Sequence, residues 1–67
     1  MVIILNNKSE FFDCDQLTVN ELLKRKKFTF KMLIIKINGQ LIKKNDYDTA
    51  IIQDADDVMV LHLVSGG

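Results

Sequence analysis

A single short helical pattern, set among strand-like segments, most constrains how this chain can fold. Residues 18–21 match a capping box, in which the threonine oxygen accepts from the backbone of the glutamate and the glutamate side chain reaches back. Val19, Leu22 and Leu23 follow at the spacing of one helical face, and residues 24–27 place positive charge where the helix dipole favours it. A short amphipathic helix of this kind needs a sheet on which to lie.

Strand patterns lie on both sides of the predicted helix. Asn6-Asn7 separates the first two as a tight turn, and Asn38-Gly39 predicts a type I′ hairpin because both residues tolerate a positive φ. Residues 45–49 are polar around a tyrosine and predict a turn or one short helical turn, and Ile51-Ile52 precede an acidic corner at residues 54–57. The predicted strands are residues 2–5, 8–13, 32–37, 40–43 and 58–64.

Size and charge limit the classes of function. A chain of 67 residues forms one small domain, and its 48% hydrophobic content predicts a packed core. Nine basic and nine acidic residues balance, which argues against nucleic-acid binding. The longest apolar run covers residues 1–5, too short to cross a membrane, and no signal peptide is evident. Because Cys14 has no partner for an internal disulfide, we expect a reducing, cytoplasmic location.

Alternation along the last predicted strand produces two apolar faces. One face carries Met59, Leu61 and Leu63. The other carries Val58, Val60, His62 and Val64. Because one helix cannot cover both sides of a sheet, we expect the second of these faces to be exposed as a partner surface, with His62 on the outer face. The alternative is a buried central strand flanked by loops.

No constellation for catalysis or metal binding is present. His62 is the only histidine and has no neighbouring cysteine or carboxylate motif. Asp54, Asp56 and Asp57 lack the long loop with a closing glutamate that calcium sites use, so we interpret them as a turn. We therefore predict neither an enzyme nor a metal site.

The order of these elements and the terminal Ser65-Gly66-Gly67 resemble the ThiS-type sulfur carriers of the ubiquitin-like β-grasp superfamily. The resemblance covers essentially the whole chain, including residues 18–23, 35–38 and 52–56. Two positions depart from the family pattern, because Ala55 stands where glycine is usual and Lys43 where proline is common. The resemblance implies an α+β fold, a mixed four- to five-stranded sheet packed on one helix, formed by residues 1–64 and followed by a flexible tail, 65–67.

The resemblance also implies a chemical role for the chain end. A ThiF-like adenylating enzyme would use ATP to activate the Gly67 carboxylate, which sulfur would convert to a thiocarboxylate. A ThiG-like thiazole synthase would then take the sulfur, with Ser65 and Gly66 threading into both enzymes. The carrier itself would bind no cofactor.

Three alternatives share part of this pattern. The small subunit of molybdopterin synthase has the same fold and terminal diglycine, although it is usually longer. A protein modifier would use the same activated Gly67 carboxylate to form isopeptide bonds with lysines. A plain binding domain would have an inert tail, because terminal glycines are often only a frayed end.

Overall fold

The computed structural model describes residues 1–29 and 31–63 and shows a strand-rich chain with one α-helix in that part. In chain order its elements are β1 (Val2–Leu5), β2 (Lys8–Phe11), β3 (Gln16–Thr18), α1 (Val19–Arg25), β4 (Leu33–Ile37), β5 (Gln40–Ile42), the 3₁₀ turn η1 (Lys44–Asp46), β6 (Ile51–Gln53) and β7 (Asp57–His62).

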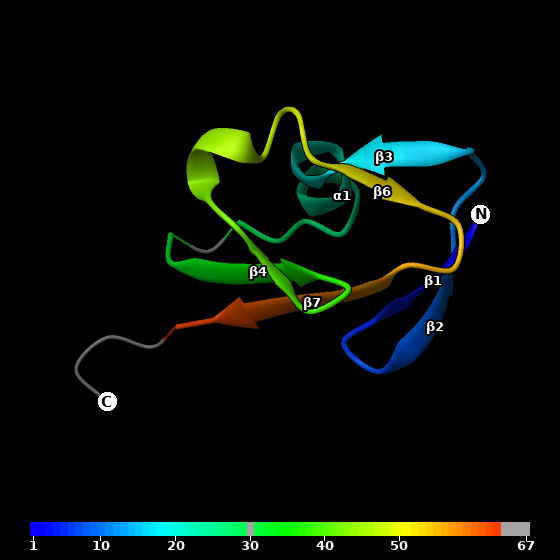
Figure 1. The fold of residues 1–67 in the computed structure, drawn as a ribbon, viewed down its shortest axis with the longest axis horizontal. Coiled ribbons are helices and arrows are strands. Elements are labelled where there is room, and N and C mark those ends of the chain that lie inside the picture. The colour runs from blue at the N-terminus through cyan, green and yellow to red at the C-terminus, as the bar shows by residue number, and fades with distance from the viewer. Residues whose placement is uncertain (30, 64–67) are drawn as a thin grey trace.

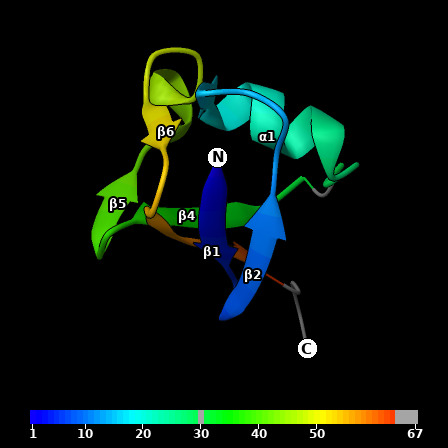
Figure 2. The same cartoon turned by 90° about the vertical axis from the view of Figure 1, so that its right-hand side faces the viewer.

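Five of the strands form one mixed sheet in the order β2-β1-β7-β4-β5. β7 is central and runs parallel to β1 but antiparallel to β4. The two hairpins, β1–β2 and β4–β5, are also antiparallel. The helix α1 lies across one face of this sheet, and the small antiparallel pair β3–β6 lies on the same side (Figure 1, Figure 2). The predicted α+β architecture, a mixed sheet packed on one helix, is confirmed.

Two tight turns have the backbone that their residues predict. Asn6 and Asn7 have φ values of 50° and 68°, and Asn38 and Gly39 have values of 50° and 82°. Asparagine and glycine enter the left-handed region at lower cost than other residues, which makes them the usual residues of two-residue hairpins. Both predicted hairpins, β1–β2 and β4–β5, are therefore confirmed.

The ends of α1 are closed by local hydrogen bonds. At its start the Glu21 amide donates to the Thr18 hydroxyl oxygen at 3.1 Å, and the Thr18 amide donates to the Glu21 carboxylate at 2.9 Å, which confirms the capping box. At its end the Phe28 amide donates to the Leu23 carbonyl at 2.9 Å, while Lys27 has a φ of 57°. This is a Schellman ending with lysine where glycine is usual.

The core fills the space between the sheet and the layer formed by α1, β3 and β6. Its fully buried side chains come from every layer. They are Ile3, Leu17, Val19, Leu22, Ile35, Ile52 and Val58. Leu23, also predicted for the core-facing side of the helix, is half-buried at the edge of this cluster.

Several element boundaries differ from the predicted ones. β2 ends at Phe11 because Phe12 turns into the core, where its amide donates to the Met1 carbonyl at 2.8 Å. β3 was not predicted; its three residues carry a single buried side chain, Leu17, and among the described strands they pair with β6 alone. β7 ends at His62. In the described part of the chain, no helix has the length and apolar character needed to span a bilayer.

Candidate functional site

The central strand β7 holds the chain in place almost to its carboxyl end. The Leu63 amide donates to the Met32 carbonyl at 3.0 Å, which continues the β4–β7 pairing one residue beyond the strand. Leu63 stands four residues before the terminal Gly67. The predicted site residues Val64, Ser65, Gly66 and Gly67 lie outside the described residues, so their roles stay predictions.

Hydrogen bonds hold β7 from both sides. β4 pairs with all the residues from Val58 to His62, whereas the parallel pairing with β1 covers only Ile4 with Asp57 and Leu5 with Val58. Beyond that point the Asn6 side chain replaces the missing strand: its Oδ1 accepts from the Val60 amide at 2.8 Å and its Nδ2 donates to the Val60 carbonyl at 3.2 Å.

Asn6 therefore has a second role that sequence reasoning missed. We interpreted it only as a turn residue. Its side-chain amide also makes the two hydrogen bonds to Val60 that the backbone of a longer β1 would make. The available signal was its place directly after β1, since an asparagine side chain offers the same donor and acceptor as a peptide group.

The predicted partner surface on β7 is wrong in its choice of face. Val58 and Val60 are 0% and 7% exposed and belong to the core, so they cannot meet a partner. Val60 pairs with the fully buried Ile35, and this register turns both valines toward α1. His62 is exposed, but the prediction that it lies on the outer face is wrong: by alternation it shares the face of Val60, at the end of the strand beyond the core.

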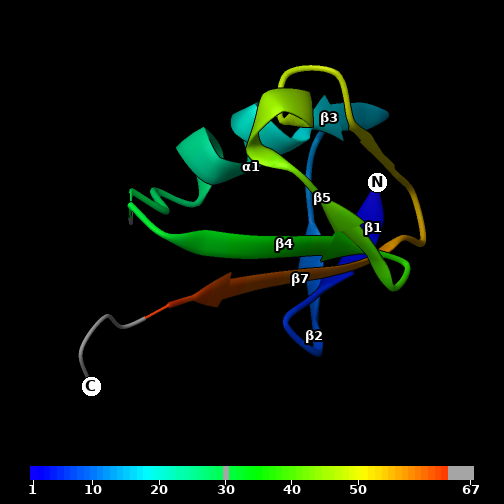
Figure 3. The ribbon, with the colours of Figure 1, turned by 60° about the vertical axis from the view of Figure 1, so that its left-hand side comes forward.

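The exposed face of β7 is the opposite one, which we call the outer apolar face. It is built from three neighbouring strands and the residue after β7, and no helix covers this side of the sheet in the described structure (Figure 1, Figure 3). Its members are Ile4, Ile34, Met59, Leu61 and Leu63. Ile4, Leu61 and Leu63 are 39%, 43% and 42% exposed, and a continuous exposed apolar patch of this kind is typical of an interaction surface.

The acidic corner before β7 is a structural turn. One Asp54 oxygen accepts from the Val2 amide at 2.7 Å, and one Asp56 oxygen accepts from the Gln53 amide at 2.8 Å. The other Asp56 oxygen accepts from the Asn38 side chain at 3.0 Å. These carboxylates are occupied in holding the start of β7, and within residues 1–29 and 31–63 no group of three potential ligands for a metal comes together.

The fold defines a ubiquitin-like β-grasp protein, and its sequence ends in a diglycine four residues after the last hydrogen-bonded position of the described chain, Leu63. The chain belongs to the ThiS family, which it matches over residues 2–67. It is similar to the thiamine biosynthesis protein ThiS of Geobacter metallireducens, whose crystal structure superposes with a TM-score of 0.90 at 28% identity and 100% coverage of both chains.

A solution NMR structure of a thiamine biosynthesis protein from the same organism is also similar. It superposes with a TM-score of 0.81 at 28% identity, with 100% of this chain and 88% of that chain covered. Among curated proteins, none matches the sequence significantly.

Proposed function

We propose that this chain is a sulfur carrier for the formation of the thiamin thiazole, and that its reactive group is the Gly67 carboxylate. Membership of the ThiS family over residues 2–67, which includes the terminal diglycine, is the observation that carries the proposal. The chain acts as a substrate of other enzymes and not as a catalyst.

The chemistry requires activation of the carboxylate. A free carboxylate is a poor electrophile because its negative charge repels nucleophiles and oxide is a poor leaving group. A ThiF-like enzyme transfers AMP from ATP to the Gly67 carboxylate, which forms a mixed anhydride and releases pyrophosphate. Sulfur at the oxidation level of sulfide then displaces AMP to leave a thiocarboxylate. A ThiG-like thiazole synthase then receives the sulfur. Gly66 and Gly67 suit passage through closed active sites because they lack a Cβ and let enzyme backbone approach closely.

The anchored end of β7 limits where an enzyme can dock. Four residues span at most about 14 Å when fully extended, so the adenylation site must come within that distance of Leu63. The outer apolar face surrounds Leu63 and extends along β7, so we propose it as the surface on which both enzymes bind.

Intact-mass analysis tests the function directly. Incubated with ATP, a sulfur donor and the activating enzyme, the chain should gain the mass difference between sulfur and oxygen, and fragmentation should locate the gain at Gly67. Deletion of Gly67 should abolish it. Cys14→Ser is the matched control, because Cys14 is the only other residue at which sulfur could be carried as a persulfide. A gain that survives deletion of Gly67 would refute the proposal.

The same preparation separates the alternatives. Transfer of sulfur to a thiazole synthase supports the thiamin pathway, whereas transfer only to a molybdopterin synthase assigns the chain to that pathway. Diglycine remnants on lysines of other proteins, with no thiocarboxylate, would instead identify a protein modifier.

A further inference from the structure

One edge of the main sheet is only partly covered. β5 pairs with β4 at Ile35, Lys36 and Ile37, and the register ends there. After Ile42 the chain leaves the sheet toward η1, on the side of α1 (Figure 3). Within residues 1–29 and 31–63, the first two residues of β4, Leu33 and Ile34, therefore have β7 on one side and no strand on the other.

Hydrogen-bond parity shows which backbone groups face this open edge. In a two-residue hairpin the flanking pair Ile37 and Gln40 exchanges backbone hydrogen bonds, as does the next alternate pair, Ile35 and Ile42. The same alternation along β4 reaches Leu33 two residues before Ile35. The amide and carbonyl of Leu33 therefore point toward the edge that β5 no longer covers. Edge groups that no neighbouring strand pairs are a template for a further strand.

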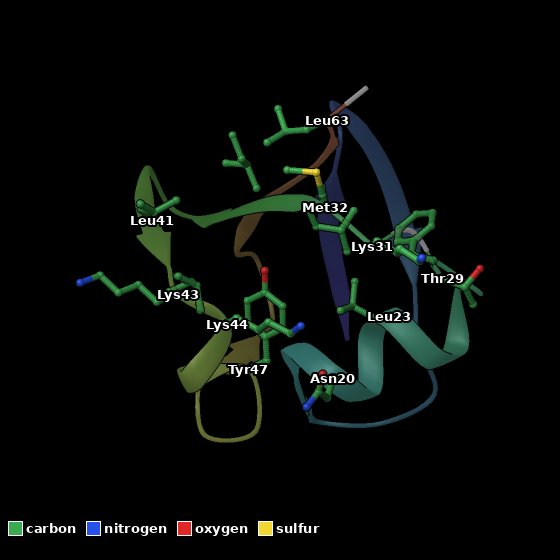
Figure 4. A pocket seen from close by; sticks show the side chains of 14 residues that line it. Asn20, Leu23, Thr29, Lys31, Met32, Leu41, Lys43, Lys44, Tyr47 and Leu63 are labelled. Carbon is green, nitrogen blue, oxygen red and sulfur yellow. The ribbon is translucent and has the colours of Figure 1, made fainter. Parts of the chain in front are cut away.

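A cavity of about 600 Å³ lies at the same edge. Its lining includes Leu23 of α1 and Tyr47 on the helix side of the sheet, and Leu41 on the opposite side (Figure 4). Leu33 and Ile42 lie between them, at the point where the two strands separate. The cavity therefore extends around the edge and is accessible from both faces.

The charged residues that line this cavity all have the same sign. They are Lys31, Lys43 and Lys44, all exposed, and no carboxylate belongs to the described lining. Asp48 lies near by but accepts a hydrogen bond from the lining residue Asn20. An apolar floor beneath three lysines is complementary to an apolar side chain flanked by carboxylates.

We propose that this edge binds an extended, acidic and apolar peptide segment of a partner protein. The segment adds as a short strand beside Leu33, places alternate apolar side chains on the two faces of the edge, and pairs its carboxylates with Lys31, Lys43 and Lys44. A free fatty acid would match the charge and the apolar floor but would leave the Leu33 backbone groups unused. The site does not depend on the proposed sulfur chemistry, because it uses neither Gly67 nor ATP.

Selection from a random library of ten-residue peptides on the immobilised protein tests the chemistry of the occupant. The enriched peptides should carry neighbouring β-branched residues flanked by Asp or Glu. In amide NMR spectra the selected peptide should shift the resonances of Leu33, Ile42 and Tyr47, none of which belongs to the outer apolar face. The proposal is overturned if the selection enriches basic or uncharged peptides, or enriches none. It is also overturned if the resonances that shift belong only to the outer apolar face.

Charge reversal gives a matched comparison. Lys43→Glu combined with Lys44→Glu should weaken the selected peptide about tenfold or more, since two attractive pairs become repulsive. Lys8→Glu combined with Arg25→Glu, which changes the net charge equally at exposed residues outside the cavity lining, should leave affinity nearly unchanged. Equal effects of the two changes, at unchanged thermal stability, would contradict the assignment.

Backbone pairing is tested separately from side-chain contacts. Methylation of alternate backbone nitrogens in the selected peptide should abolish binding in one of the two registers, because it removes the donors that face Leu33. Strand addition is refuted if the protein binds both methylated forms of the peptide. It is also refuted if dodecanoate displaces a peptide that makes no contact with Leu33, because that result indicates a small-molecule pocket. Deletion of Gly67 should leave peptide binding intact, which separates this test from that of the proposed function.

Discussion

Ala55 has a left-handed backbone conformation, with a φ of 71°, in the corner between β6 and β7. The conformation lets the Asp56 amide donate to the Gln53 carbonyl at 3.1 Å while the Asp56 carboxylate accepts from the Gln53 amide at 2.8 Å. An alanine Cβ is strained in this region and glycine is not. The departure from the family pattern at this position therefore costs stability.

We expect Ala55→Gly to raise the free energy of unfolding by about 1 kcal/mol. Urea denaturation of the purified protein measures the change. Gly39→Ala is the matched control: at a φ of 82° its new Cβ meets no atom within 4 Å, so any loss of stability comes from the backbone alone. Stabilisation by both changes, or by neither, would contradict this account.

The capping carboxylate of Glu21 makes the helix start sensitive to acid. The hydrogen bond donated by the Thr18 backbone, followed by that of its side chain, lowers the pKa of Glu21 below its ordinary value of 4.5. A carboxyl group with a lowered pKa in the folded state stabilises the fold above its ordinary pKa, and this contribution is lost as the pH falls through the folded value.

The predicted outcome is a decrease in stability below pH 4.5 that Glu21→Gln reduces. Glutamine can still reach the Thr18 backbone but does not titrate in this range, so it preserves the cap while removing the acid response. Thermal unfolding recorded between neutral and acid pH would show the difference. Parallel pH profiles for the two proteins would disprove it.

Features set by neighbouring residues could be predicted at this scale. The capping box at residues 18–21 and the Asn38-Gly39 turn depend on contacts within a few residues, and both were found as expected. The lysine in the left-handed position at residue 27 was not predicted, because nothing in its side chain favours that conformation.

At the scale of elements, the orientation of β7 decides what the protein can expose. Val60 is 7% exposed and faces α1, whereas the next residue, Leu61, is 43% exposed on the outer apolar face. Val60→Ala should lower the free energy of unfolding by about 2 kcal/mol, since it removes buried methyl groups and leaves a cavity. Leu61→Ala should stay within about 0.5 kcal/mol of the parent.

The same denaturation experiment compares the two variants. A larger loss for Leu61→Ala than for Val60→Ala would mean that the faces are assigned the wrong way round.

Alternation alone could not orient this strand. Both faces of β7 are mainly apolar. The alternation of residues along the strand therefore divides them into two faces without indicating which face is buried. The decision comes from the register with β4, in which Val58 and Val60 pair with Ile37 and Ile35. That register joins residues far apart in sequence. β3 escaped prediction for a related reason: its stability comes from pairing with β6, and one buried Leu17 in three residues produces no pattern.

At the scale of the whole molecule, the outer apolar face and the chain end should work together. We expect Leu61→Asp to raise the KM of the activating enzyme for the carrier about tenfold or more, because a charge in an apolar interface must be desolvated without a partner. Ile51→Asp is the matched control, since Ile51 is similarly exposed at 39% but lies on β6, in the layer on the other side of the sheet.

Steady-state kinetics of ATP-dependent pyrophosphate release, with each variant as substrate, would measure this effect. Equal KM values for both variants would show that the enzyme docks elsewhere.

The global arrangement was predicted better than the docking surface. One amphipathic helix among several strands, with apolar residues to bury, restricts a chain of this size to a sheet covered on one side. The choice of terminal residues as the reactive site rests on the family resemblance, since no arrangement of side chains in residues 1–29 and 31–63 indicates it.

The parallel placement of β1 and β7 has a mechanical consequence. These strands lie side by side, with β1 next to the amino end of the chain and β7 close to the carboxyl end. A force that pulls the two ends apart slides one strand along the other and loads their shared hydrogen bonds together, instead of opening them one at a time. The fold therefore resists a force applied between its two ends more strongly than a force that separates the same two strands from one end.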